Sequence, residues 1–156
     1  MATAARRARM AAAPTSDPAC VFCKIVARQI PARIVHEDEE TLAFLDVHPL
    51  AEGHALVVPK AHRARLEDLN EDEARAFFAT VVKVNRRSRK ATGAPATTLA
   101  VNNGPEAGQE VPHLHLHVVP RVKGDGAGAI HALRWPRPTL APARMDELTK
   151  EIRLLP

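Results

Sequence analysis

The chain has 156 residues, with 22 lysines and arginines against 18 acidic residues and a formal net charge of +4. This length fits one domain of ordinary size, which can bury a core without disulfides. No apolar run is long enough to cross a membrane, and the start lacks the hydrophobic segment of a secretory signal, so we expect a cytoplasmic protein. Only 3% of the residues are aromatic. The basic run Lys83–Lys90 therefore lacks the stacking partners of a single-strand binder, and nucleic-acid binding is not expected.

The first elements follow a tail of alanines and arginines. Residues 1–18 are predicted to be a disordered tail, and residues 19–156 a single domain. A short helix can begin at Val21 and is stopped by Pro31. Two strands, Arg33–His36 and Thr41–Asp46, are joined by the acidic turn EDEE and predict a hairpin. The short apolar run His54–Val58 has the length of a buried strand.

The clearest helix begins after Asn70, which can cap it, with Glu73 as the partner in a capping box. Gly93 is the expected end. Apolar residues at three- and four-residue spacing predict its buried stripe: Ala74, Phe77, Phe78, Val81 and Val82.

The last strands carry the most unusual pattern of the chain. A fourth strand is expected to end at Asn102, and the segment HLHLHVVPR, His113–Arg121, is predicted to be a fifth. Side chains alternate across a strand, so the three histidines would share one face while Leu114, Leu116 and Val118 point to the other. Residues 142–155 are predicted to form a closing helix.

Three histidines on one face do not serve packing, because they would repel one another when protonated. Alternating imidazoles can bind zinc, and they can also supply a nucleophile with flanking donors for a phosphate. The preceding loop, Asn102–Gln109, offers amide and backbone donors without a carboxylate at the strand face, which favours a phosphate. Separately, Cys20 and Cys23 have a spacing that indicates a metal or redox pair in a reducing compartment, and a pair alone is half a zinc site.

Two blocks of the chain resemble the two characteristic blocks of bacterial histidine triad (HIT) proteins. The first runs from Val21 to His62, with Val21 its one substitution, and the second from Asn102 to Arg121. In the second, HLHLHVV matches the pattern His-φ-His-φ-His-φ-φ, where φ is apolar. The resemblance extends from about Cys20 to Trp135.

The resemblance implies an α+β protein with the HIT fold. It implies a five-stranded antiparallel sheet, one long and one or two short helices, and a dimer that joins two sheets into one of ten strands. By the same resemblance, the substrate is a purine nucleotide derivative attacked at its α-phosphorus by His115. The resulting nucleotidyl-histidine is cleaved by water, while His117 donates a hydrogen bond to the phosphate. Such a mechanism needs no catalytic metal.

The resemblance also assigns the remaining site residues. Asp46 would take ribose hydroxyls, Phe44 and Val47 would border the base, and His54 would lie near the phosphate. The substrate-binding set is then Phe44, Asp46, Val47, His54, Asn102, Gly108 and Gln109. Structural zinc is implied in a site made by Cys20, Cys23, His62 and His113.

The leaving group stays open at this stage. Phosphoramidase relatives have serine after the loop glutamine, and this chain has Glu110, whose carboxylate would repel a negatively charged leaving group. Both P–N and P–O–P substrates therefore remain candidates. An alternative function is a zinc-stabilised nucleotide-binding module with little turnover.

Overall fold

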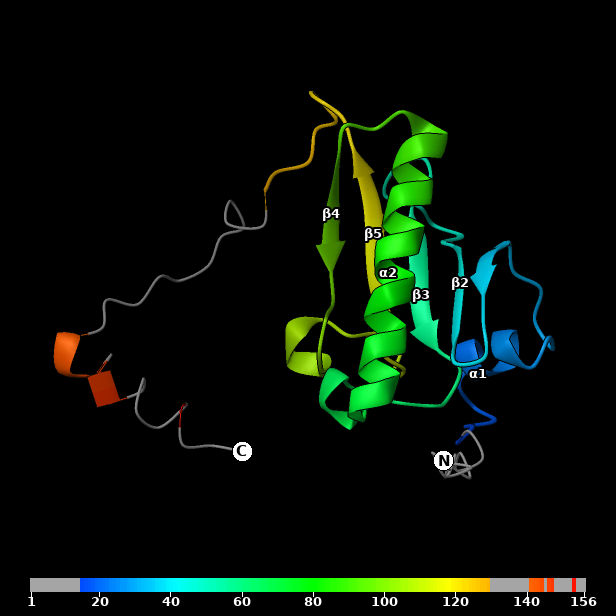
Figure 1. Ribbon diagram of the computed structural model, residues 1–156, viewed down its shortest axis with the longest axis horizontal. Coiled ribbons are helices and arrows are strands. Elements are labelled where there is room, and N and C mark those ends of the chain that lie inside the picture. The colour runs from blue at the N-terminus through cyan, green and yellow to red at the C-terminus, as the bar shows by residue number, and fades with distance from the viewer. Residues whose placement is uncertain (1–14, 130–140, 145, 148–152, 154–156) are drawn as a thin grey trace, which may run out of the picture. The chain divides into compact units, whose positions relative to one another are not determined.

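The computed structural model describes residues 15–129, 141–144, 146–147 and 153. Its centre is a five-stranded antiparallel sheet in the order β1-β2-β3-β5-β4 (Figure 1). The five predicted strands are present, and the first four differ from the prediction by one or two residues at their ends. Their bounds are Ile34–Glu37 (β1), Thr41–Leu45 (β2), Ala55–Pro59 (β3), Ala96–Ala100 (β4) and Leu116–Arg121 (β5).

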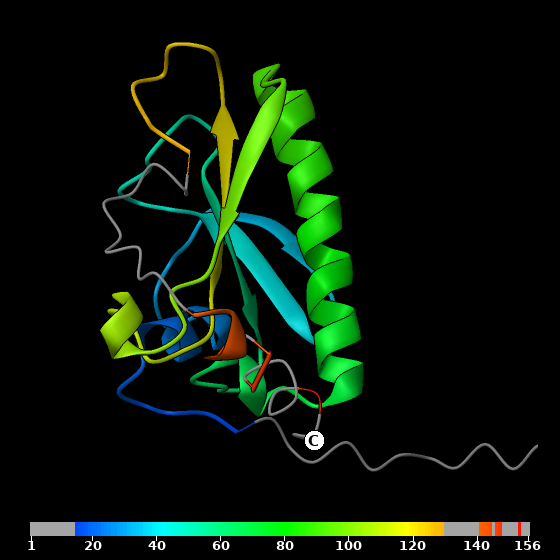
Figure 2. The same cartoon turned by 90° about the vertical axis from the view of Figure 1, so that its left-hand side faces the viewer.

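Helices lie on both faces of this sheet. The long helix α2 (Glu71–Thr92) covers one face, and the short helix α1 (Val21–Val26) lies on the other, as the turned view shows (Figure 2). Two 3-10 turns, Leu66–Asp68 and Pro105–Ala107, lie in the connections. The fold is therefore the predicted α+β arrangement, with one long and one short α-helix within residues 15–129.

The ends of α2 are set by local sequence, as predicted. The Asn70 side chain accepts hydrogen bonds from the backbone N–H groups of Asp72 and Glu73, and Glu73 closes the capping box. At the other end, Gly93 takes a left-handed conformation with φ of 69°, which glycine adopts without steric cost.

The buried stripe of α2 differs from the prediction. Phe77 and Val81 are buried, but Phe78 and Val82 are each 46% exposed, and Ala74 is half-buried. Thr80 is buried in their place, because its hydroxyl donates to Asp38 Oδ2 at 3.1 Å. A buried hydroxyl with a partner costs little, so the buried stripe of α2 includes a polar residue that apolar spacing does not predict.

Each face of the sheet has its own core. The helix-side core, which packs against α2, consists of Ala43, Ala55, Val57, Phe77, Val81, Val84, Leu114, Leu116 and Val118. The histidine-side core, which packs against α1, consists of Cys20, Phe22, Cys23, Ile25, Leu42, Phe44, Leu56 and Val58. The alternation of the histidine segment is thus confirmed, because its apolar residues Leu114, Leu116 and Val118 all lie in the helix-side core.

The prediction that the fifth strand begins at His113 was wrong. Strand β5 begins at Leu116, and only His117 of the three histidines lies within it. Before that point, the Leu114 N–H donates to the Arg63 carbonyl at 2.6 Å instead of joining the ladder with β3. Strand β3 ends there at Pro59, which has no N–H to donate.

The chain divides into two compact units, with the boundary between Lys123 and Gly124. The sheet, both α-helices and both 3-10 turns belong to the first unit. Of the predicted closing helix, residues 142–144 and 146–147 are helical, and most of the rest lies outside the described residues, as do Trp135 and most of the predicted tail. The single domain over residues 19–156 and the disorder of residues 1–18 stay predictions. Within the described part of the chain, no helix combines the length and apolarity needed to cross a bilayer.

Candidate active site and metal centre

His115 lies just before β5 and is 8% exposed. Its Nδ1 is 2.7 Å from the carbonyl oxygen of His113. A carbonyl can only accept a hydrogen bond, so Nδ1 carries the proton and the neutral ring keeps its lone pair on Nε2. An imidazole held in this tautomer offers Nε2 as a nucleophile without first losing a proton.

His117 and His54 form a hydrogen-bonded pair beside it. His54 Nε2 and His117 Nδ1 are 3.0 Å apart, and the ring centroids of His115 and His117 are 5.1 Å apart. Burial, followed by the nearby His115, lowers the pKa of His117 to about 4. Burial also lowers the pKa of His54, against the opposing effect of Asp46. Both rings are therefore neutral near pH 7.

Phe22 is a site residue that the sequence analysis missed. Its ring centroid lies 5.1 Å from that of His115, 5.8 Å from that of His113 and 5.6 Å from that of Phe44. The contact with His115 is edge-on, at 72° between the ring planes. The sequence did contain a signal for this role. Phe22 lies between Cys20 and Cys23, and both cysteines were already assigned to the same site as His113.

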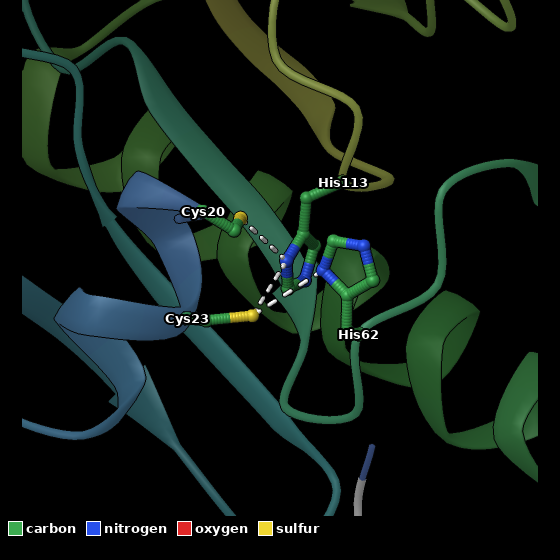
Figure 3. Close-up of side chains that lie close together, drawn as sticks. All are labelled: Cys20, Cys23, His62 and His113. Carbon is green, nitrogen blue, oxygen red and sulfur yellow. Dashed lines mark hydrogen bonds between the residues drawn. The ribbon is translucent and has the colours of Figure 1, made fainter. Parts of the chain in front are cut away.

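Cys20, Cys23, His62 and His113 are brought together as the resemblance implied (Figure 3). One ligand atom from each lies within 4.8 Å of the others. His113 Nδ1 is 3.4 Å from Cys20 Sγ and 3.6 Å from Cys23 Sγ, and His62 Nδ1 is 3.3 Å from Cys23 Sγ. In a tetrahedral zinc site with its usual bond lengths, sulfur and nitrogen ligands stand about 3.5 Å apart. The spacing of this cluster fits zinc.

The protonation of the cluster also fits a metal. His113 Nε2 is 2.9 Å from the Pro59 carbonyl oxygen, so it carries the proton and leaves the Nδ1 lone pair directed at the thiols. Burial raises the pKa of the Cys20 thiol, whereas a bound cation stabilises a thiolate. Two thiolates and two imidazoles form a closed structural site with no open position for substrate.

Asp46, His54 and His117 form a second group whose possible ligand atoms lie within 4.8 Å of one another. Three of their four ring nitrogens are already used in hydrogen bonds, since His54 Nδ1 accepts from the Leu50 N–H at 3.0 Å and His54 Nε2 faces His117 Nδ1. We therefore interpret this group as a hydrogen-bond chain and not as a metal centre.

The residues predicted to border the nucleoside lie in β2 and directly after it. Asp46 directly follows β2, and its Oδ1 accepts the His48 N–H at 2.8 Å while its Oδ2 lies 3.7 Å from His54 Nδ1. Phe44 is buried beneath Phe22, whereas Val47 is 71% exposed.

The loop before the histidines bonds mainly to itself and to the segment that carries His62. The Gln109 amide donates to the Ala64 and Val111 carbonyls at 2.8 and 3.0 Å, and its oxygen accepts the Gly104 N–H at 2.8 Å. Asn102 donates to the Gly108 carbonyl at 3.3 Å. Both amide hydrogens of Gln109 are thus engaged in holding the loop, while Asn102 keeps a second amide hydrogen for other partners.

Comparison with known proteins identifies the family. The family model described as the HIT domain matches residues 27–124. A HIT-like protein of Methanocaldococcus jannaschii is 47% identical over 107 residues, covering 69% of this chain and 82% of that protein. The adenosine 5'-monophosphoramidase HNT1 of Saccharomyces cerevisiae is 36% identical over 144 residues, covering 92% of this chain and 87% of the yeast enzyme.

Solved structures give the same result. The crystal structure of a HIT family member from Bacillus subtilis has a TM-score of 0.78 and 37% identity, covering 88% of this chain and 98% of that one. A Zn-bound histidine triad family protein from Mycobacterium smegmatis has a TM-score of 0.66 and 40% identity, covering 69% of this chain and 78% of that one. The fold and the histidine cluster define a histidine triad protein. The chain belongs to the HIT family, and within it the protein is an enzyme of the hydrolase class.

Proposed function

We propose that this enzyme hydrolyses or transfers nucleotides at the α-phosphate of a purine nucleotide derivative, through a covalent intermediate on His115. The observation that carries the proposal is the hydrogen bond from His115 Nδ1 to the His113 carbonyl, which leaves the Nε2 lone pair free. The similarity to an adenosine 5'-monophosphoramidase supports a nucleotide substrate.

The reaction proceeds in two displacements. His115 Nε2 forms a bond to the α-phosphorus, and the bond from phosphorus to the leaving group breaks. Water then forms a P–O bond as the P–N bond to His115 breaks, which releases a nucleoside monophosphate and regenerates the imidazole. Splitting one difficult displacement into two gives each a lower barrier.

His117 stabilises the phosphate during both steps. Because its Nδ1 faces His54, the proton of the neutral ring is available on Nε2 for a non-bridging oxygen. Removing one such donor typically costs about 3 kcal/mol of transition-state stabilisation. Asn102 would add its second amide hydrogen as a further donor, and Gly108 and Gln109 would contribute mainly by holding that loop.

The nucleoside would lie across the end of β2. The Asp46 carboxylate can accept hydrogen bonds from the two ribose hydroxyls. Phe22 and the exposed Val47 provide apolar surfaces for a purine base, with Phe44 supporting Phe22 from below.

The leaving group is the open part of this proposal. Glu110 is exposed, so its carboxylate can turn away from the phosphate or assist an amine as it departs. The yeast relative is named for activity on a P–N bond. We therefore place a nucleoside phosphoramidate first and a dinucleoside polyphosphate second.

The test is intact-mass spectrometry of the wild type and His115→Ala after brief mixing with adenosine phosphoramidate or, separately, a dinucleoside polyphosphate. We expect an adenylyl adduct on the wild type, absent from the variant, and the donor that gives more adduct identifies the leaving group. Absence of adduct and of product with both donors would overturn the proposal and favour the nucleotide-binding module.

We also propose that zinc occupies the cluster of Cys20, Cys23, His62 and His113 as a structural ion. When bound, zinc ties α1 and its Phe22 to the segment that carries His115. The spacing of the four ligand atoms and the Zn-bound Mycobacterium smegmatis relative support this role. Zinc requires the two cysteines to be reduced, which is consistent with the cytoplasmic location expected from the sequence.

Finally, we propose a homodimer through the β4 edge of the sheet. Strand β4 pairs only with β5 within the described chain. Beside it stand three exposed apolar residues, each 46% exposed, namely Phe78, Val82 and Leu99. Thr97 Oγ1 bonds to Asn85 of α2, so Leu99, two residues further along β4, lies on the same face as these helix residues.

The dimer is tested by light scattering coupled to gel filtration. We expect Leu99→Glu to convert a dimer into a monomer, because it places two like charges in the interface. Val35→Glu is the matched control, since Val35 is also half-exposed but lies on β1 at the opposite edge. A wild-type monomer, or a dimer in both variants, would contradict this interface.

A further inference from the structure

The loop between β2 and β3 reaches the active site through its backbone. Leu50 has a side chain that is 76% exposed, yet its backbone N–H donates to His54 Nδ1 at 3.0 Å. His54 itself is buried and starts the segment that leads into β3. Leu50 therefore contacts the site through its backbone N–H, and this contact does not depend on the identity of its side chain.

This contact determines which nitrogen of His54 carries the proton. A backbone N–H can only donate, so His54 Nδ1 must offer its lone pair and the proton of the neutral ring lies on Nε2. That Nε2–H faces His117 Nδ1 at 3.0 Å and donates to it. The proton of neutral His117 is then placed on Nε2. One backbone N–H thus sets the tautomers of two successive rings.

A competing arrangement is present in the same loop. Asp46 Oδ2 is 3.7 Å from His54 Nδ1, too far for a hydrogen bond but close enough to attract a proton at that atom. A proton on Nδ1 would leave Nε2 as an acceptor and reverse the direction of donation toward His117. The charged and titratable groups that face His54 are Asp46 from the loop and His117 from β5, with His115 behind His117.

The position of the Asp46 carboxylate limits this competition. Its Oδ1 accepts the His48 N–H at 2.8 Å, and the Asp46 backbone N–H donates to the His54 carbonyl at 3.0 Å. These bonds hold the carboxylate beside the His54 ring while the Leu50 N–H occupies the Nδ1 lone pair.

We propose that the Leu50 backbone N–H is a positioning group that locks His54, and through it His117, in the tautomer with the proton on Nε2. The inference rests on the proposed function, because it matters for turnover only if His117 donates to the phosphate. Without the Leu50 N–H, His117 Nε2 would be unprotonated in a fraction of the molecules. It would then be an acceptor where the phosphate oxygen needs a donor.

The first test does not depend on activity or on any variant. In two-bond ¹H–¹⁵N spectra of the wild type labelled with ¹⁵N-histidine, at neutral pH and without substrate, we expect Nδ1 of both His54 and His117 to resonate as unprotonated nitrogens. A protonated Nδ1 on His54 would overturn the lock. The tautomers and the covalent mechanism are tested separately. A protonated His54 Nδ1 would leave adduct formation at His115 possible, and the predicted tautomers could be found in a protein that forms no adduct.

The second test removes the donor. Leu50→Pro has no N–H at a position where the side chain is exposed, and Leu50→Ala keeps the N–H as its matched control. We expect Leu50→Pro to give mixed tautomers at His54 and His117 and to lower kcat roughly ten- to a hundredfold with little change in KM. Leu50→Ala should resemble the wild type in both respects. Wild-type tautomers and kcat in a folded Leu50→Pro would overturn the proposal, and the wild-type spectrum decides if that variant does not fold.

Discussion

The two faces of the sheet are built from the same five strands but differ in what they bury. The helix side buries apolar side chains packed between the strands and α2, together with the hydrogen-bonded threonines Thr41 and Thr80. On the other face, the histidine-side core adjoins five buried or half-buried histidines and two thiols, covered in part by the six-residue helix α1. A densely packed core on one face gives the strands fixed positions, which lets the other face hold imidazoles at hydrogen-bond distances from one another.

The largest expected effect is a loss of activity when the proposed nucleophile on the histidine side is replaced. Replacing His115 with Asn removes the proposed nucleophile, so kcat/KM should fall by roughly 10⁴-fold, as for other essential catalytic groups. His48→Asn changes an exposed histidine and is the control. Steady-state kinetics on the donor that gives the adduct measure the effect. Substantial turnover in a folded His115→Asn would remove the basis for assigning chemistry to this face.

A pair of phenylalanine substitutions compares the two faces directly. Phe77 belongs to the helix-side core and Phe22 to the histidine side, and each change to Ala should cost about 3 to 5 kcal/mol of unfolding free energy. Only Phe22→Ala should also lower kcat/KM, by roughly tenfold, because Phe22 contacts His115. Urea unfolding and kinetics at 25 °C distinguish them. An equal kinetic loss in both variants would show that the faces are not functionally separate.

The metal cluster predicts a smaller change in stability. His62→Gln removes one zinc ligand. If the free zinc concentration is a few hundred times the Kd of the wild-type site, loss of zinc binding lowers the free energy of unfolding by about 3 kcal/mol. The exposed His48→Gln should retain both zinc and stability. Elemental analysis of the purified proteins, together with thermal unfolding, provides the measurement. Equal zinc content in the two variants would exclude His62 as a ligand.

The pH dependence of stability gives the smallest effect. The pKa of His117 falls from its ordinary 6.5 to about 4 on folding, mainly through burial. Between these values the unfolded chain binds more protons than the folded one, so stability decreases as the pH drops through that window. The full shift would correspond to about 3 kcal/mol, and because the His117 ring is only partly buried, solvent screening reduces the expected loss to about 2 kcal/mol.

The measurement is urea unfolding of the wild type and His117→Gln at pH 7 and pH 4. Both proteins share the metal cluster, so any acid release of zinc is common to them and the difference isolates His117. An identical loss in the two proteins would mean that His117 is not buried as a neutral ring.

The sequence by itself determined the local features of this protein. The caps of α2 at Asn70 and Gly93 depend on residues within one helical turn, and the alternation of Leu114, Leu116 and Val118 with the histidines depends only on strand geometry. The approximate strand positions follow from the same short-range patterns. The grouping of Cys20, Cys23, His62 and His113 came from resemblance, since no local rule joins residues so far apart in the chain.

Tertiary structure decided the rest, because contacts between distant segments override local preference. The buried Thr80 took the place expected for Phe78 through its bond to Asp38, and the Arg63 carbonyl drew Leu114 away from the ladder, so that β5 began at Leu116. Phe22 reached His115 only through the placement of α1 on the sheet. The Leu50 N–H could not be found from the sequence at all, since every residue except proline carries one and only the folded loop directs it at His54.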